Sequence, residues 1–132
     1  MTTINKEQLT IREEQLTNGL RVVFTDESNR YFGDYHRICV VATIGFNLQD
    51  LPTESPDDEI FRNQAIESLG GQLSVVKRFE RMGVESADVE KVRTTLIDDF
   101  LQHTATYLSR PDYPRSLVKA EMNKSRTRRF YA

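Results

Sequence analysis

Asp34 and His36 are the residues whose types and spacing come closest to an acid/base centre. They lie in the stretch NRYFGDYHR, residues 29 to 37. Residues two apart on a β-strand project from one face, so a carboxylate at 34 could orient an imidazole at 36. Catalysis would also need a nucleophile, a metal ion or an oxyanion-binding group, and the sequence places none beside them. A small enzyme with an Asp34/His36 centre is therefore the third hypothesis for function.

The same stretch can instead be interpreted as a partner-binding surface or as a corner of a sheet. Three aromatic residues lie beside charged ones, a combination typical of protein interfaces. In a purely structural role, Asp34 would bond the backbone of a turn and His36 would lie at a strand edge. The first hypothesis is a small cytoplasmic, non-enzymatic interaction or regulatory domain with its contact surface around residues 30–37. The residues expected to bind a protein partner are Tyr31, Phe32, Asp34, Tyr35, His36 and Arg37.

Other residues that could do chemistry are better explained by structure. His36 and Cys39 have the spacing of a metal-binding pair, but residues three apart on a strand project from opposite faces. Gly70 and Gly71 follow a predicted helix and lack the lysine and hydroxyl of a phosphate-binding loop, so they indicate a helix end. We therefore expect no metal ion and no other cofactor, and we assign no catalytic residue.

The composition predicts a small protein in the cytoplasm. The chain has 132 residues, of which 38% are apolar, enough to fill one core. Its formal net charge of -2 does not require a nucleic-acid or acidic-lipid partner. No apolar run approaches the roughly 20 residues of a membrane-spanning helix, and the N-terminus lacks the pattern of a secretory signal. We therefore expect a cytoplasmic location without membrane contact.

Charge is distributed unevenly along the chain. Residues 110–132 hold seven Lys and Arg against two acidic residues, which leaves an excess of acidic residues in the preceding part. We predict a single α+β domain over residues 1–122, followed by a basic, flexible tail over residues 123–132. The alternative hypothesis for function is nucleic-acid binding by this tail. The acidic body argues against it, because it repels phosphate.

A hairpin is the clearest local signal near the N-terminus. Asn18 and Gly19 suit the two central positions of a type I′ turn, and β-favouring residues follow them over 20–24. Residues 11–17 are the weaker strand of this hairpin, and their charged residues are typical of a guarded sheet edge.

Two further strands are predicted from composition and alternation. Residues 34–48 are the most β-rich run, with apolar residues on one face, and should form the long strand at the middle of the sheet. Cys39, the single cysteine, lies inside this run and is expected to be a buried thiol. Residues 72–79 alternate less regularly and predict another strand.

The register of the first strands contains a conflict. A turn at residues 33 and 34 would pair Phe32 with Tyr35, and would then place the apolar residues of 20–24 on the opposite side from those of the central strand. One inserted residue restores a common face. We expect either a bulge within residues 25–29 or an irregular loop over residues 25–34.

Helix signals follow the central strand. Ser55 suits an N-cap and precedes a proline and two acidic residues, so a helix is predicted over 56–69. Ser86 suits the cap of the longest apolar periodicity, which predicts a helix over 87–109. Pro114 is expected to open a third, short helix.

Together these elements predict an α+β domain. We expect a mainly antiparallel sheet of about four strands with two long helices packed on one face and a short C-terminal helix. One edge of the sheet carries charges, and the other could pair with a second copy of the chain. The expected partners are thus a protein or a second copy in a homodimer.

Two fragments, LTNGLRVV and AIESLGGQL, resemble parts of the N-terminal half of pitrilysin-type zinc peptidases. Those enzymes need a His-x-x-Glu-His helix, and this sequence contains only two histidines, His36 and His103. The resemblance therefore implies no peptidase activity.

Overall fold

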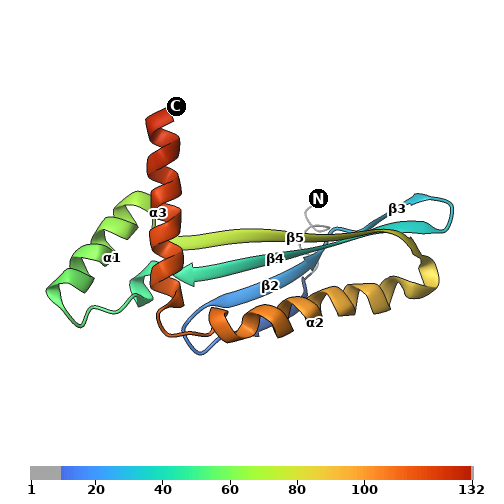
Figure 1. Ribbon diagram of the computed structural model, residues 1–132, viewed down its shortest axis with the longest axis horizontal. Helices are drawn as coiled ribbons and strands as arrows, with labels where there is room; N and C mark the ends of the chain where they lie inside the picture. Colours follow the sequence, from blue (N-terminus) through green and yellow to red (C-terminus); the bar gives the residue numbers. More distant parts are fainter. Residues whose placement is uncertain (1–9, 132) are drawn as a thin grey trace, which may run out of the picture.

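The structure, a computed structural model, describes the backbone of residues 10–131 and the side chains of residues 10–125. Residues 1–9, which bear on the secretory-signal prediction, and Ala132 lie outside the described residues. The predicted α+β class with a mainly antiparallel sheet is confirmed (Figure 1). The described elements are β1 (Thr10–Gln15), β2 (Arg21–Asp26), β3 (Asn29–Phe32), β4 (Tyr35–Asn47), the 3-10 helix η2 (Leu48–Asp50), α1 (Pro56–Leu69), β5 (Gln72–Glu85), the 3-10 helix η3 (Ser86–Asp88), α2 (Val89–Leu108) and α3 (Tyr113–Tyr131).

The sheet is built around β4, the long central strand that the sequence predicts. Across the sheet the order is β1, β2, β4 and β5, and each neighbouring pair is antiparallel. The short β3 pairs with the beginning of β4, along the same edge of β4 as β2 and beyond the point where β2 ends. β5 continues to Glu85, past its predicted end at residue 79, because it follows β4 to the end of the β3–β4 hairpin.

The turn between β1 and β2 differs from the predicted two-residue turn. The N–H of Gly19 donates to the carbonyl of Leu16 (3.2 Å), and the N–H of Leu16 donates to the carbonyl of Leu20 (2.8 Å). These bonds enclose a three-residue loop. Gly19, with a φ of 96°, takes the left-handed position that such a loop requires.

Asn18 connects this turn to the end of α2. Its side-chain amide donates to the carbonyls of Leu108 (2.6 Å) and Arg110 (2.8 Å). Its carbonyl oxygen accepts from the N–H of Leu20 (3.2 Å). The carbonyl of Leu108, the last residue of α2, has no partner within the helix and gains a donor from Asn18. The carbonyl of Arg110 accepts from Asn18 as well as from the N–H of Tyr113 (3.1 Å).

The β3–β4 turn has the predicted pairing and the predicted inserted residue. Phe32 pairs with Tyr35 across the turn. The register then shifts between Arg30 and Phe32, so Tyr31 is the inserted residue and its predicted place within residues 25–29 is wrong. The alternative, an irregular loop over residues 25–34, is also wrong, because β3 forms a paired strand there. Because one extra residue restores the alternation, the apolar residues of β2 and β4 share a buried face.

Glu27 and Ser28 interrupt the strand between β2 and β3 without shifting its register. The N–H of Cys39 donates to the Ser28 hydroxyl oxygen (2.9 Å), which replaces a backbone acceptor. The carbonyl of Glu27 accepts from the Arg37 guanidinium (3.4 Å). Two side chains thus satisfy backbone groups at the break, and Cys39 beside it is buried as predicted.

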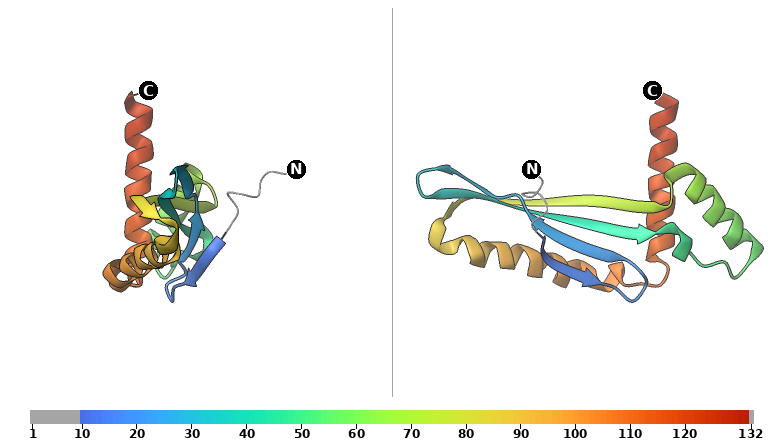
Figure 2. Two further views of the ribbon diagram at one scale, coloured as in Figure 1. Left: turned by 90° about the vertical axis from the view of Figure 1, so that its right-hand side faces the viewer. Right: turned by 180° about the vertical axis from the view of Figure 1, so that it is seen from behind.

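One face of the sheet is covered by α2, which packs along β4 and β5 (Figures 1 and 2). The ring of Phe100 packs edge-on against Phe24, with centroids 5.8 Å apart, and tilted against Phe79 at 5.1 Å. Arg93 of α2 forms a largely buried ion pair with Asp26 of β2 (3.1 Å). Alternate residues of β4 complete the centre of the core: Ile38, Val40, Ala42, Ile44 and Phe46.

α1 does not lie beside α2 on the sheet, as the sequence led us to expect. It packs against α3 and η2 at one end of the sheet (Figures 1 and 2). Only Gly70 and Gly71 separate α1 from β5, so the last turn of α1 lies close to the beginning of β5. Ala65, Val118 and Met122 are buried in this second part of the core.

The two predicted helix caps have different outcomes. Ser55 caps α1, because its hydroxyl accepts from the N–H of Asp58 (3.1 Å). The prediction that Ser86 caps α2 is wrong. The helix begins at Val89 after η3, and the cap position, Asp88, makes no side-chain cap bond.

α3 begins at Tyr113, next to the predicted Pro114, and continues to Tyr131 (Figure 1). The stretch predicted as a tail, residues 123–132, therefore continues this helix as far as it is described. None of the helices within residues 10–131 combines the length and the apolarity needed to cross a bilayer.

Candidate partner-binding site at the β3–β4 hairpin

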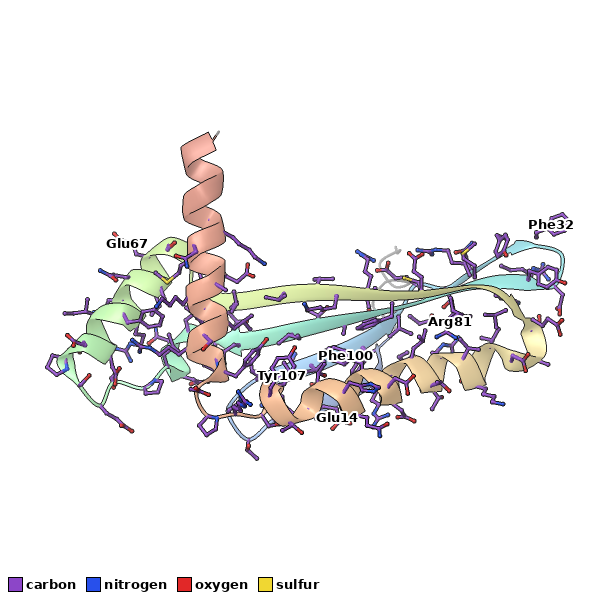
Figure 3. The ribbon with its side chains drawn as sticks, viewed as in Figure 1. Glu14, Phe32, Glu67, Arg81, Phe100 and Tyr107 are labelled. Carbon is purple, nitrogen blue, oxygen red and sulfur yellow. The ribbon has the colours of Figure 1, made fainter. Side chains whose placement is uncertain are left out.

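The predicted contact segment forms the end of an arm made by β3 and the beginning of β4. This arm extends beyond β2, with β5 as the neighbouring strand (Figure 3). Phe32 is 72% exposed at its end, and Tyr31 and Tyr35 are 47% and 42% exposed. We call these three residues the aromatic tip. Rings exposed to this extent contribute little to the core, so packing within the chain does not explain their presence.

The polar residues of the segment attach the arm to η3, the 3-10 helix that precedes α2. Asp34, at the turn, accepts hydrogen bonds from the hydroxyl of Ser86 (2.5 Å) and from its N–H (3.3 Å). His36 Nε2 lies 2.9 Å from the same hydroxyl oxygen. We call Asp34, His36 and Ser86 the Ser86 clamp, because they join the hairpin to η3.

The Ser86 clamp differs from a nucleophilic triad in the order of its contacts. In such a triad, histidine takes the serine proton and the carboxylate orients the histidine. Here the Ser86 hydroxyl donates to Asp34, so His36 Nε2 acts as a donor to the Ser86 oxygen. The hydroxyl bond from Ser86, followed by the backbone bond, lowers the pKa of Asp34, which makes it a weak general base. This geometry favours a structural role over an activated nucleophile.

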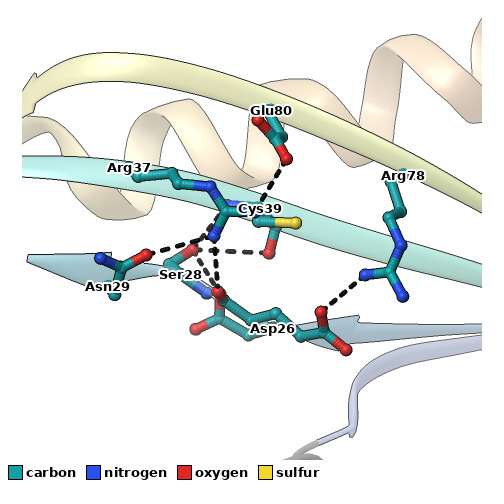
Figure 4. Close-up of polar contacts among 8 residues, drawn as sticks. Asp26, Ser28, Asn29, Arg37, Cys39, Arg78 and Glu80 are labelled. Carbon is teal, nitrogen blue, oxygen red and sulfur yellow. Dashed lines mark hydrogen bonds and ion pairs between the residues drawn. The ribbon is translucent and has the colours of Figure 1, made fainter.

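Arg37 is also held within the chain, on the sheet face that points away from α2. Its guanidinium contacts Glu80 of β5 (2.8 Å) and Asn29 of β3 (3.1 Å) (Figure 4). The hydrogen bond to Glu80 is the main reason that the pKa of Arg37 is raised. The six predicted site residues thus divide into two groups. The aromatic residues are exposed, and Asp34, His36 and Arg37 are engaged by neighbouring side chains.

Sequence reasoning missed the contribution of β5 to this site. The β4–β5 register shifts opposite Arg37, where Met82 and Gly83 form a bulge. Gly83 has a φ of 68°, and a Cβ at this position would lie 4.0 Å from the Tyr31 hydroxyl. Met82 is 57% exposed in this bulge, on the face of β5 that points away from α2. A glycine inside a strand pattern is the signal that could have indicated the bulge.

Two open clefts lie away from the aromatic tip, and neither is lined by Asp34 or His36. The larger, about 430 Å³, lies between the start of α1 and the start of α3, where carboxylates such as Asp58 and Asp112 line it. The smaller, about 360 Å³, lies beside the β1–β2 turn and the end of β4. Within the part of the chain that the structure describes, no three His, Cys, Asp or Glu side chains are grouped to hold a metal ion.

Comparisons of this chain with protein-family models, with curated proteins and with solved structures find no match. The case for a function therefore depends on the geometry of the described residues, above all on the exposed rings of the arm.

Proposed function

We propose that this chain is a non-enzymatic, cytoplasmic interaction domain that binds a protein partner through the aromatic tip. The observation that carries the proposal is the 72% exposure of Phe32 at the end of an arm held by the Ser86 clamp. Exposed aromatic residues supply most of the binding energy at many protein interfaces.

The arm is suited to binding because its polar contacts order it in advance. Asp34 and His36 attach the turn to Ser86, and Arg37 attaches β4 to Glu80. A surface already held in one conformation loses less entropy on binding. Tyrosine and phenylalanine have few rotatable bonds, so each ring offers a large contact area at low entropic cost. The expected partner presents an apolar pocket that accepts Phe32.

Replacing Phe32 with serine should weaken partner binding about 30-fold or more, because a central aromatic anchor contributes at least about 2 kcal/mol. A photoreactive phenylalanine analogue at position 32 would first identify the partner by cross-linking in the cells that make this chain. The same analogue at Ile60, an exposed apolar residue of α1, is the matched control. Calorimetry with the purified partner would then compare the original chain with the Phe32→Ser and Ile60→Ser variants.

Circular dichroism and thermal unfolding should be nearly unchanged in Phe32→Ser, because the ring is mostly exposed. Cross-links that form equally from positions 32 and 60 would contradict the proposal. So would an affinity for the identified partner that Phe32→Ser leaves unaltered.

A second candidate function, nucleic-acid binding, is favoured by the course of α3. The helix continues through the basic stretch after Met122 and projects away from the sheet (Figures 1 and 2). Removal of residues 124–132 should then abolish a gel shift that is visible at low salt and declines steeply as salt is added. Absence of any shift at low salt would dismiss this candidate.

A further inference from the structure

The outer edge of β5 is a long strand edge that pairs with no other strand in residues 10–131. β5 extends over Gln72–Glu85, and β4 is its only strand partner there. The opposite edge of the sheet, β1, covers only Thr10–Gln15. An exposed edge presents unpaired N–H and C=O groups, which can pair with a strand from another chain.

The face of β5 that points away from α2 has a self-complementary order of side chains. Val76 and Met82 are the exposed apolar residues, at 50% and 57%. Between them lie Arg78 and then Glu80. An antiparallel copy of this sequence sets each apolar residue opposite the other, and sets the cation opposite the anion.

We propose that β5 pairs antiparallel with β5 of a second copy, about a twofold axis at Phe79. In this register, Val76 lies opposite Met82 of the second copy and Arg78 lies opposite Glu80 of the second copy. A shift of two residues in one direction would set Arg78 opposite Arg78 of the second copy. The same shift in the other direction would set Glu80 opposite Glu80 of the second copy. Like charges directly opposite each other destabilise a strand pair. The two Arg78–Glu80 pairs of the proposed register offset its two pairs of Lys77 with Arg81, whereas each shifted register has a like-charge pair that no opposite-charge pair offsets, so charge favours the proposed register.

Ion pairs already present in each copy extend this arrangement. Arg78 contacts Glu27 (2.6 Å), and Arg37 contacts Glu80 (2.8 Å) (Figure 4). Across the interface the order becomes Glu27 and Arg78 of one copy, then Glu80 and Arg37 of the second, with alternating charge throughout. Such partly exposed charges set the register more than the affinity. The affinity comes from the new backbone ladder and from the apolar pairs.

Lys77 makes the register testable. It points to the α2 face, where the proposed pairing sets it opposite Arg81 of the second copy, an unfavourable pair of cations. Lys77 is in none of the ion pairs recorded for the described residues. Lys77→Glu would convert both symmetry-related contacts into ion pairs. In the two shifted registers, residue 77 would face Phe79 or Gly83 instead, and no gain would follow.

Sedimentation velocity of the full chain over a range of concentrations provides the first test. The original chain should sediment as a concentration-dependent mixture of monomer and dimer. Lys77→Glu should lower the dimer dissociation constant roughly fivefold or more, since two cross-strand pairs change from repulsive to attractive. Lys91→Glu, an identical charge change at an exposed position of α2, should leave it unaltered. A monomer at every concentration for all three chains, or equal effects of the two substitutions, would overturn the proposal.

Disulfide trapping provides the second test. A chain with Val76→Cys and Met82→Cys should form a cross-linked dimer under mild oxidation, because these positions meet across the interface. Within one strand they are too far apart to bond each other. Val76→Cys with Glu80→Cys is the control, since it would cross-link only in a shifted register. Cys39 is buried and is left unchanged. Cross-linking of the control pair alone, or of neither pair in folded protein, would contradict the register.

The dimer and the aromatic tip can be tested separately. β4 lies between β3 and the outer edge of β5, so Phe32→Ser should leave the dimer dissociation constant unchanged. Failure of one proposal therefore leaves the other intact.

Discussion

Ser86 illustrates how the role of a single residue depends on a partner that is distant along the chain. A serine ahead of an apolar helical pattern typically caps the helix. In this fold the Ser86 hydroxyl donates to Asp34, and its oxygen lies beside His36 Nε2. The same side chain therefore holds the hairpin that carries the aromatic tip.

Replacing Ser86 with alanine should raise the pKa of Asp34 towards its ordinary value, because the Ser86 hydroxyl is the main cause of the lowering. In the original chain the folded-state pKa lies below the unfolded-state pKa. The ionised carboxylate therefore stabilises the fold fully above the ordinary carboxyl pKa, and this contribution is lost as pH falls through the lowered pKa. An NMR titration of the Asp34 carboxyl carbon in both chains would measure the change.

The control for this titration is Ser74→Ala, at an exposed position of β5. It should leave the Asp34 titration unaltered. In the original chain, the Ser86 amide proton should also lose protection against exchange, relative to the intrinsic rate at the same pH, once Asp34 is protonated, because Asp34 accepts from that N–H. An identical Asp34 titration with and without the Ser86 hydroxyl would show that the clamp does not persist in solution.

At the scale of elements, the contact between the β1–β2 turn and α2 joins the hairpin to the long helix. Asn18→Ala should lower the free energy of unfolding by about 1–2 kcal/mol, because the carbonyls of Leu108 and Arg110 both lose a donor. Asn18→Asp should lower it further, since a carboxylate would face two carbonyl oxygens. Urea unfolding would measure both effects, with Asn63→Ala, at an exposed position of α1, as the control. Equal effects of alanine and aspartate would contradict this account.

Local sequence patterns located the elements but did not determine how they pack or which turn joins them. Gly70 follows the end of α1 at Leu69, as the sequence predicts. The helix nevertheless lies at the end of the sheet, because its partners in packing are α3 and η2, which the local pattern does not specify. The turn at Asn18 and Gly19 is in the predicted place but has a different type, since the pairing of Leu16 with Leu20 sets the loop length.

At the scale of the whole molecule, the arm and the outer edge of β5 are two separate surfaces. In the proposed dimer the two β5 strands are antiparallel, so the two aromatic tips point in opposite directions. Such a dimer would bind two partner molecules, or a partner with two suitably spaced sites, with increased avidity. The Lys77→Glu variant, which strengthens the dimer, should therefore increase the avidity for an immobilised partner. The affinity of a single aromatic tip for a single partner molecule should stay the same.

Most of the elements of this protein were determined by the sequence itself. Alternation identified the buried face of β4, and Ser55 with Pro56 marked the start of α1, because these signals act over a few neighbouring residues. The exposed rings of the aromatic tip also belonged to a candidate segment that was visible in the sequence.

Only the tertiary structure decided which distant residues meet. The inserted residue at Tyr31, the bulge at Gly83 and the contact of Ser86 with Asp34 depend on strand register, which a single displaced residue alters along a whole strand. The ion pairs of Arg37 and Arg78 have the same origin, because their partners come from other strands. Contacts between residues far apart in the chain exist only once the sheet has assembled.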